Sequence, residues 1–224
     1  MNLTELDAAE RVRNGLFPSP FKFAAMWLVN LRITGTGLAY RANGNEHVWR
    51  SPDFYLNNQF LSRCNGLPVI TEHTKEKALD EREFSQRIVG TVLLPYIRGD
   101  EVWAIARIYP KWVVDEISKG GVSTSPNVLF TTANTGTLVS EGDRNFLIEG
   151  VPFLIDHIAL VPLGVWDKDG QPKGVEVTEP LSESEKMAAM VKDAVNAAFQ
   201  APTAALEALN QRLIAMEQEV NHVR

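Results

Sequence analysis

Short hydrophobic blocks separated by turn residues fill most of the first 180 positions of this 224-residue chain. Blocks of this kind, rich in β-branched and aromatic residues, predict strands. The clearest case is a hairpin, in which Ile88–Leu94 and Glu101–Ile108 flank the turn Arg98-Gly99-Asp100. Further strands are predicted at Leu67–Thr71, from Val122 onward and at Phe153–Val161.

Two helices inside this region have recognisable starts and stops. Ser51-Pro52-Asp53 begins a helix that ends at Gly66, and Pro110 begins a second one that ends at Gly120-Gly121. The charged segment 75–87 is expected to be an exposed loop or a frayed helix. A further hairpin is predicted around Asp167–Gly170.

These patterns divide the chain into three parts. Residues 1–29 begin with a polar stretch broken by two prolines and are expected to form an N-terminal arm outside the core. Residues 30–178 are expected to form a β-rich domain with at least two helices, and residues 179–224 a helical tail. The predicted fold class is therefore α+β, with a mostly antiparallel core.

The tail carries its own pattern. Ser182 and Glu185 form a capping box at its start. Apolar residues then recur with alternating spacings of three and four, as in the a and d positions of a coiled coil: Leu206, Leu209, Leu213, Met216, Val220 and Val223. We expect this stripe to mediate self-association or partner binding, and packing on the domain is the alternative.

Composition narrows the possible functions. The formal charge of −6 argues against general nucleic-acid binding, which needs a basic surface. Cys64 is the only cysteine, which excludes an internal disulfide and a cysteine-rich zinc site and fits a reducing cytosol. The start has no signal-peptide pattern, and the apolar run Phe23–Val29 is too short to cross a bilayer. We expect a soluble, intracellular protein that does not bind membranes.

Candidate chemistry centres on Ser123, which follows the turn Gly120-Gly121 at the start of a predicted strand. A serine hydroxyl becomes nucleophilic when a base takes its proton, and a third group must orient that base. His73, at the end of a strand, and His157, within the most hydrophobic strand, supply the imidazoles. The other histidines, His47 and His222, are expected at the surface.

Two positions in this set have alternatives. Side chains alternate along a strand, so Asp156 and His157 point to opposite faces unless a bulge intervenes. Only one of them can then face the site, and either could be the third member of the triad. Ser125 is the alternative nucleophile. A metal-dependent hydrolase using two histidines and an acid is a rival hypothesis, although the chain has no closely spaced ligand pair. It has no glycine-rich phosphate loop, and no cofactor is expected.

The order of several short motifs resembles the tailed-phage prohead (capsid maturation) protease group, which is distantly similar to herpesvirus assemblin. The motifs span about residues 31–164, and they are Thr36-Gly37, Tyr40-Arg41, Leu67-Pro68-Val69, Glu72-His73, Ile88–Val92, Ala104–Tyr109, Gly121-Val122-Ser123 and Asp156–Val161. The chain departs from the group after the serine, where Ser125-Pro126 replaces a glycine and an aromatic residue. It also lacks an arginine in the loop after the last strand.

The resemblance implies a β-barrel-like serine protease flanked by helices, with His73, Ser123 and His157 as the triad. Without that arginine, backbone N–H groups near Gly164 and Val165 are the candidates for the oxyanion site. Such proteases act inside the procapsid in the host cytoplasm, cleave scaffold and major capsid proteins, and often cleave themselves. We therefore expect a serine endopeptidase of capsid maturation; a non-catalytic head-assembly or scaffold protein on the same fold is the alternative.

Overall fold

The computed structural model describes residues 3–41, 45–76, 78–141 and 144–180, and single positions up to 195. The chain separates into two units, residues 1–180 and 181–224. In the second unit, Ser182 and Glu185 form the predicted capping box, with the Ser182 N–H donating to the Glu185 carboxylate over 2.9 Å. The heptad stripe and His222 lie outside the described residues.

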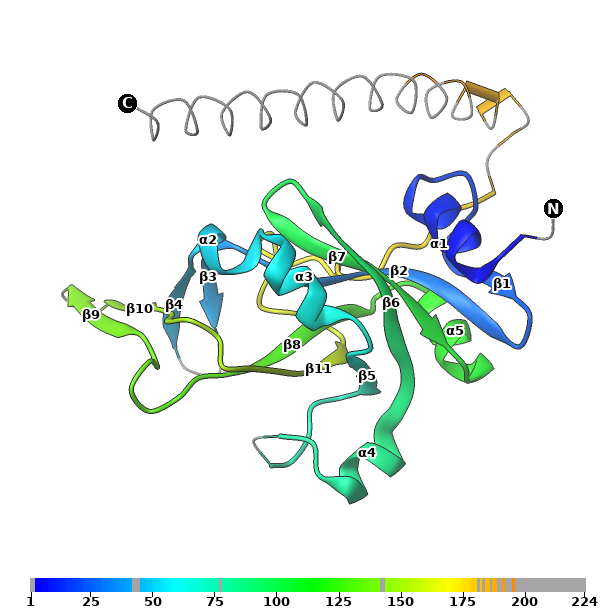
Figure 1. Cartoon of the computed structure of the whole chain (residues 1–224). Helices are drawn as coiled ribbons and strands as arrows, with labels where there is room; N and C mark the ends of the chain where they lie inside the picture. The colour runs from blue at the N-terminus through cyan, green and yellow to red at the C-terminus, as the bar shows by residue number, and fades with distance from the viewer. Residues whose placement is uncertain are drawn as a thin grey trace, which may run out of the picture. The chain divides into compact units, whose positions relative to one another are not determined.

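The first unit is a mixed α+β structure that is mostly sheet (Figure 1). Its helices are α1 (Glu5–Arg13), α2 (Pro52–Tyr55), α3 (Asn58–Cys64), α4 (Glu81–Arg87) and α5 (Lys111–Ser118). The larger sheet has seven strands, in the order β1 (Phe21–Phe23), β2 (Met26–Gly35), β7 (Glu101–Ile108), β6 (Ile88–Arg98), β5 (Pro68–Thr71), β11 (Leu154–Val161) and β8 (Ser123–Leu129).

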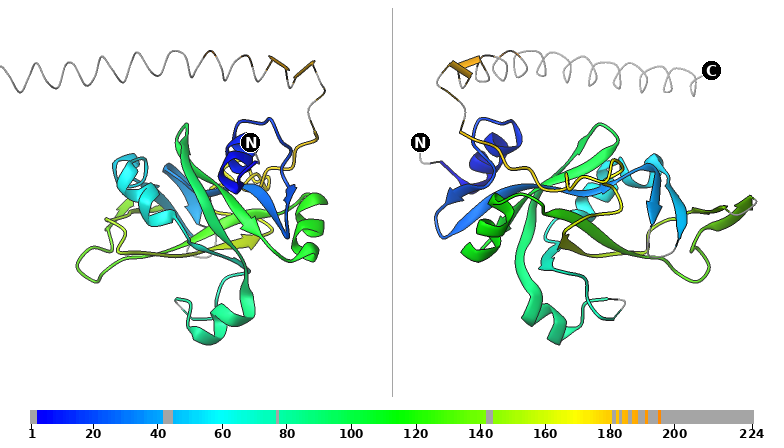
Figure 2. Two further views of the ribbon diagram at one scale, coloured as in Figure 1. Left: turned by 45° about the vertical axis from the view of Figure 1, so that its right-hand side comes forward. Right: turned by 180° about the vertical axis from the view of Figure 1, so that it is seen from behind.

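A smaller sheet of four strands has the order β3 (Gly37–Arg41), β4 (Glu46–Arg50), β10 (Arg144–Ile148) and β9 (Thr137–Glu141). Figures 1 and 2 show it at the end of the unit opposite α1 and α5. The chain passes from the larger sheet to the smaller at Thr36, between β2 and β3. The two sheets together provide the walls of the candidate site described below.

The strands of the described part form no closed barrel, but β8, at one edge of the larger sheet, lies against β2, next to the other edge. The Thr124 hydroxyl of β8 donates to the Arg32 carbonyl of β2 over 2.6 Å. The segment after residue 173 also follows β2, because the Arg32 N–H donates to the Gly174 carbonyl and the Glu176 N–H to the Asn30 carbonyl. The hairpin predicted around Asp167–Gly170 is therefore wrong: its second half pairs with β2 through a single bridge at Val175.

Residues 3–29 do not form an arm outside the core. Ala8, Ala9 and Val12 of α1 are buried against Met26 and Leu28 of β2 in a small apolar cluster. The main core lies on the other side, beneath α3 and α5. The first unit thus includes the N-terminal residues as a helix and strands.

Candidate active site

His73 lies two residues after the end of β5, and the residue between them has an unusual backbone conformation. Glu72 has a φ of 61°, in the left-handed region that non-glycine residues rarely adopt, and its N–H donates to the Leu160 carbonyl of β11 over 3.2 Å. His73 Nδ1 then lies 3.1 Å from Nε2 of His157, which is fully buried in β11. The structure therefore brings together the two histidines singled out in the sequence. Backbone strain of this kind often marks a functional site.

A β-bulge gives Asp156 access to His157. The ladder between β11 and β8 pairs Ile155 with Val128 and then His157 with Asn127, so Asp156 is the extra residue. Its Oδ2 lies 2.7 Å from His157 Nδ1 and also accepts the Leu79 N–H over 2.8 Å. The parity argument allowed this exception, and both candidates for the third member belong to one chain of hydrogen bonds.

This chain fixes the proton positions on both rings. A carboxylate only accepts hydrogen bonds, so His157 carries its proton on Nδ1 and its Nε2 is an acceptor. His73 must then donate from Nδ1, which leaves its Nε2 without a proton. Burial lowers the pKa of both rings; the neighbouring His157 lowers that of His73 further, whereas Asp156 partly opposes the shift at His157. His73 Nε2 is therefore a free base near neutral pH.

The two candidate serines lie in different surroundings. Ser123 is fully buried, and its Oγ accepts the Gly174 N–H over 3.0 Å. Ser125 is half-buried and lines a cavity of about 520 Å³ that His73 also lines. The register places Ser125 opposite Ala159 and Asn127 opposite His157, so the side chain of Ser125 is on the face of His157. The structure thus places Ser125, and not Ser123, in one cavity with His73.

No hydrogen bond joins the Ser125 hydroxyl to His73 among the residues that the structure describes. Such bonds are often long without substrate and shorten in the complex.

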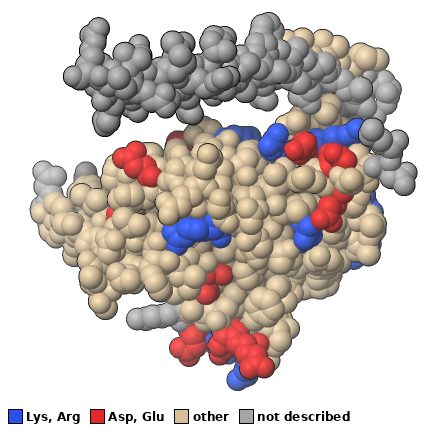
Figure 3. Space-filling view, in the orientation of Figure 1, with Lys and Arg blue, Asp and Glu red and all other residues tan. Residues whose placement is uncertain are grey.

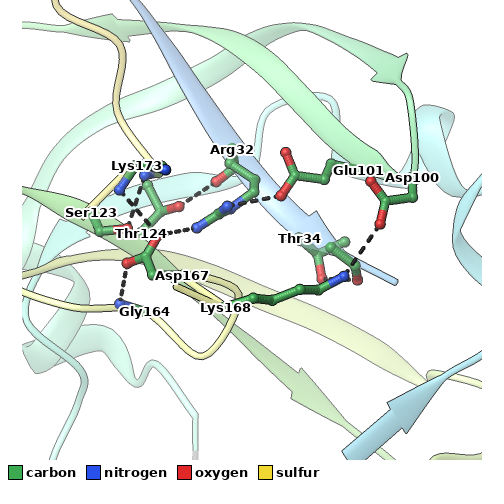
Figure 4. Close-up of polar contacts among 12 residues, drawn as sticks. Arg32, Thr34, Asp100, Glu101, Ser123, Thr124, Gly164, Asp167, Lys168 and Lys173 are labelled. Carbon is green, nitrogen blue, oxygen red and sulfur yellow. Dashed lines mark hydrogen bonds and ion pairs between the residues drawn. The ribbon is translucent and has the colours of Figure 1, made fainter. Parts of the chain in front are cut away.

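The two residues predicted to bind the oxyanion, Gly164 and Val165, differ in whether their N–H groups are available. The Gly164 N–H donates to Asp167 Oδ2 over 2.7 Å, so it is not free to bind an oxyanion (Figure 4). Gly164 itself passes so close to β8 that a Cβ atom there would lie 2.1 Å from the Thr124 carbonyl oxygen. Val165 lines the cavity together with Trp166. Val165 therefore stays a candidate donor.

A buried ion-pair cluster forms another part of the cavity wall, and no motif in the sequence predicts it. Arg50 of β4 binds Glu149 through two nitrogens, at 2.5 and 3.0 Å. Its guanidinium group lies against the rings of Tyr55 and Trp166, with its central carbon 4.7 and 4.8 Å from the ring centres. Arg41 also binds Glu149, at 2.9 Å. Because Arg41 and Arg50 come from β3 and β4 and Glu149 follows β10, the cluster holds these parts of the smaller sheet together, and through Trp166 it reaches the loop after β11.

Other features of the described residues bear on the remaining predictions. No three His, Cys, Asp or Glu side chains in the described part are placed to hold a metal ion, and none of its helices is long and apolar enough to cross a membrane. His47 lies away from the cavity, stacked on Phe146. On the face seen in Figure 3, basic side chains form small separate groups, and acidic ones form several groups, one of them over α4.

No protein-family model, curated protein or solved structure matches this chain.

Proposed function

We propose that this protein is a serine endopeptidase in which Ser125 is the nucleophile and His73 the general base. The observation that carries the proposal is the hydrogen-bonded chain His73–His157–Asp156, whose free end lines the same cavity as the Ser125 hydroxyl. Acyl transfer by serine requires a nucleophile, a neutral base and a group that orients the base; here His157 contacts His73, and Asp156 contacts His157 in turn.

The reaction would have two halves, formation of an ester on Ser125 and hydrolysis of that ester, and His73 would act as the base in both. His73 Nε2 takes the proton of Ser125 as Oγ attacks the peptide carbonyl, and a tetrahedral oxyanion forms. The positive charge on His73 is stabilised through the hydrogen bond to His157 and the negative charge of Asp156. His73 then gives its proton to the leaving amine, the peptide bond breaks, and an ester on Ser125 remains. Water, activated by the same base, hydrolyses that ester.

The cavity would accept the substrate as an extended segment. Its lining combines apolar side chains from β4, β10 and β8, such as Val48, Leu147 and Val128, with the ion-paired Arg41. The lining thus offers a bound peptide both apolar contacts and polar or charged partners.

The order of the sequence motifs gives the finer proposal, a capsid-maturation protease with an assemblin-like, barrel-related fold. Its substrates would be phage scaffold and major capsid proteins, and the chain itself, inside an assembling procapsid. The hydrogen bond from Thr124 to Arg32, which links the end strand β8 to β2 near the opposite edge of the sheet, supports the relation to a barrel. Self-association through the tail belongs to this proposal too.

The test compares two serine variants. Purified wild type, Ser125→Ala and Ser123→Ala are treated with a fluorophosphonate, and the labelled residue is located by mass spectrometry. We expect label on Ser125 in the wild type and none at position 125 in Ser125→Ala. Ser123→Ala should still be labelled but should lose about 1–3 kcal/mol of stability, because the buried Gly174 N–H loses its acceptor.

Intact masses after co-expression with phage head proteins then test the substrate. Shortened head proteins with wild type, and full-length ones with Ser125→Ala, would support a maturation protease. Label on Ser123 would overturn the assignment of the nucleophile. No label in any variant and no cleavage would favour the non-catalytic head-assembly protein.

A further inference from the structure

A tight turn follows β11 at Gly164–Asp167 and is closed by two hydrogen bonds. The Asp167 N–H donates to the Gly164 carbonyl over 3.1 Å, and the Gly164 N–H donates to Asp167 Oδ2 over 2.7 Å. The N–H groups of Val165 and Trp166, in the middle of the turn, have no acceptor among the described residues. The turn thus keeps two adjacent donors unused.

The turn lies directly beside the proposed nucleophile. Gly164 contacts the backbone of Thr124, the residue before Ser125, at a distance that leaves no room for a Cβ atom. Val165 and Trp166 line the same cavity as Ser125. The unused donors are therefore on a loop that borders the same cavity as Ser125.

Asp167 holds this turn through a buried network, shown in Figure 4. Its side chain has no exposed surface and accepts hydrogen bonds from Arg32 of β2 and from the Lys173 N–H, in addition to Gly164. Arg32 is 4% exposed and also binds Glu101 of β7 over 2.8 Å. A buried carboxylate is costly unless it is paired and hydrogen-bonded, so this arrangement fixes Asp167, and with it the turn.

The ring of Trp166 is fixed independently. It lies against the Arg50 guanidinium group, and it packs so closely on Gly35 that a Cβ there would be 2.7 Å from the ring. Both ends and the middle of the turn are thus held by the body of the domain. Donors that need no rearrangement during the reaction are the kind that stabilise a developing charge most.

We propose that Asp167 and Arg32 are positioning residues, which aim the Val165 and Trp166 N–H groups at the oxyanion formed on attack by Ser125. The inference rests on the proposed function. Asp167 and Arg32 touch neither substrate nor nucleophile, and they act through the turn. Their loss affects an interaction made in the transition state, so it slows the chemical step and leaves the base unchanged.

Two chemical probes separate these effects. A fluorophosphonate reacts with Ser125 and develops negative charge on its phosphoryl oxygen, so it needs both the base and the donors. Diethylpyrocarbonate modifies the free Nε2 of His73 and needs only an accessible neutral ring. Both rates are measured for wild type, Asp167→Asn and Arg32→Lys. Asp169→Asn is the matched control, since Asp169 lies in the same loop but is exposed and pairs only locally.

We expect Asp167→Asn to slow fluorophosphonate labelling roughly 100-fold, the effect of a shift of about 1 Å in a reacting group. Arg32→Lys, which keeps the charge, should slow it less, and Asp169→Asn should not change it. The diethylpyrocarbonate rate at His73 should stay the same in all variants. An equal loss in both rates, or no loss in labelling by either variant, overturns the inference. Absence of label in the wild type refutes the proposed function instead.

Discussion

The carboxylate of Asp156 offers the sharpest test of the hydrogen-bonded chain. Asp156→Asn replaces it with a group of the same shape that still has an oxygen for the Leu79 N–H. It removes the negative charge 2.7 Å from His157 Nδ1. That charge stabilises the positive charge that develops on the two rings during proton transfer, so its loss should slow the reaction of Ser125.

The size of the effect follows from the energy of one charge-assisted hydrogen bond. Such bonds contribute about 1.5–3 kcal/mol. Since 1.36 kcal/mol corresponds to a factor of ten in rate, labelling of Ser125 should slow by roughly 10- to 150-fold. The base itself is intact in this variant, so activity should fall without disappearing, whereas His73→Ala should abolish it.

The assay is the second-order rate of fluorophosphonate labelling at neutral pH, followed by intact mass. Asp115→Asn, on the exposed side of α5, also removes one carboxylate charge, but from a residue outside the hydrogen-bonded chain, and it should leave the rate unchanged. Nitrogen NMR of ¹⁵N-histidine protein gives an independent measure, with the proton on Nδ1 of both His73 and His157 in the wild type. Wild-type labelling in Asp156→Asn, or a proton on His73 Nε2, would refute the reasoning.

Two further predictions concern stability. Burial holds the pKa values of His73 and His157 below 6.5. The two neutral rings therefore contribute to the free energy of unfolding above about pH 6.5, and this contribution is lost as pH falls through the lowered values. Urea unfolding measured across pH should show this decrease, and the double variant His73→Gln/His157→Gln should remove it. Glu149→Gln leaves Arg50 with an uncompensated buried charge and should cost about 3–5 kcal/mol in urea unfolding, whereas exposed Glu179→Gln should cost almost nothing; equal losses would contradict this.

Local turn chemistry explains what could be predicted from the sequence. The hairpin of β6 and β7 turns at Gly99, with a φ of 61°, and α5 begins after Pro110 and ends before Gly120. In these cases a few adjacent residues determine the backbone. The sequence does not indicate that α1 belongs to the core, because two of the three buried residues on its inner face, Ala8 and Ala9, are small.

The site depends on contacts between distant segments, which local patterns do not specify. His73 and His157 meet because β5 and β11 are parallel neighbours, 84 positions apart at the two rings. Ser123 and Ser125 have the same strand parity, so parity cannot separate them; the segment at Gly174 that covers Ser123 does so. The bulge at Asp156 is a change of register by one residue and has no sequence signature of its own.

The hydrogen bond between Leu79 and Asp156 joins the chain His73–His157–Asp156 to the segment that connects β5 to α4. Leu79 belongs to the stretch between β5 and α4, and its amide shares the same carboxylate oxygen as His157. Any excursion of that stretch withdraws one donor from Asp156 and changes how strongly it holds the imidazole. The rate of amide hydrogen exchange at Leu79 therefore reports how often the hydrogen bond to Asp156 opens, and it can be measured without a substrate.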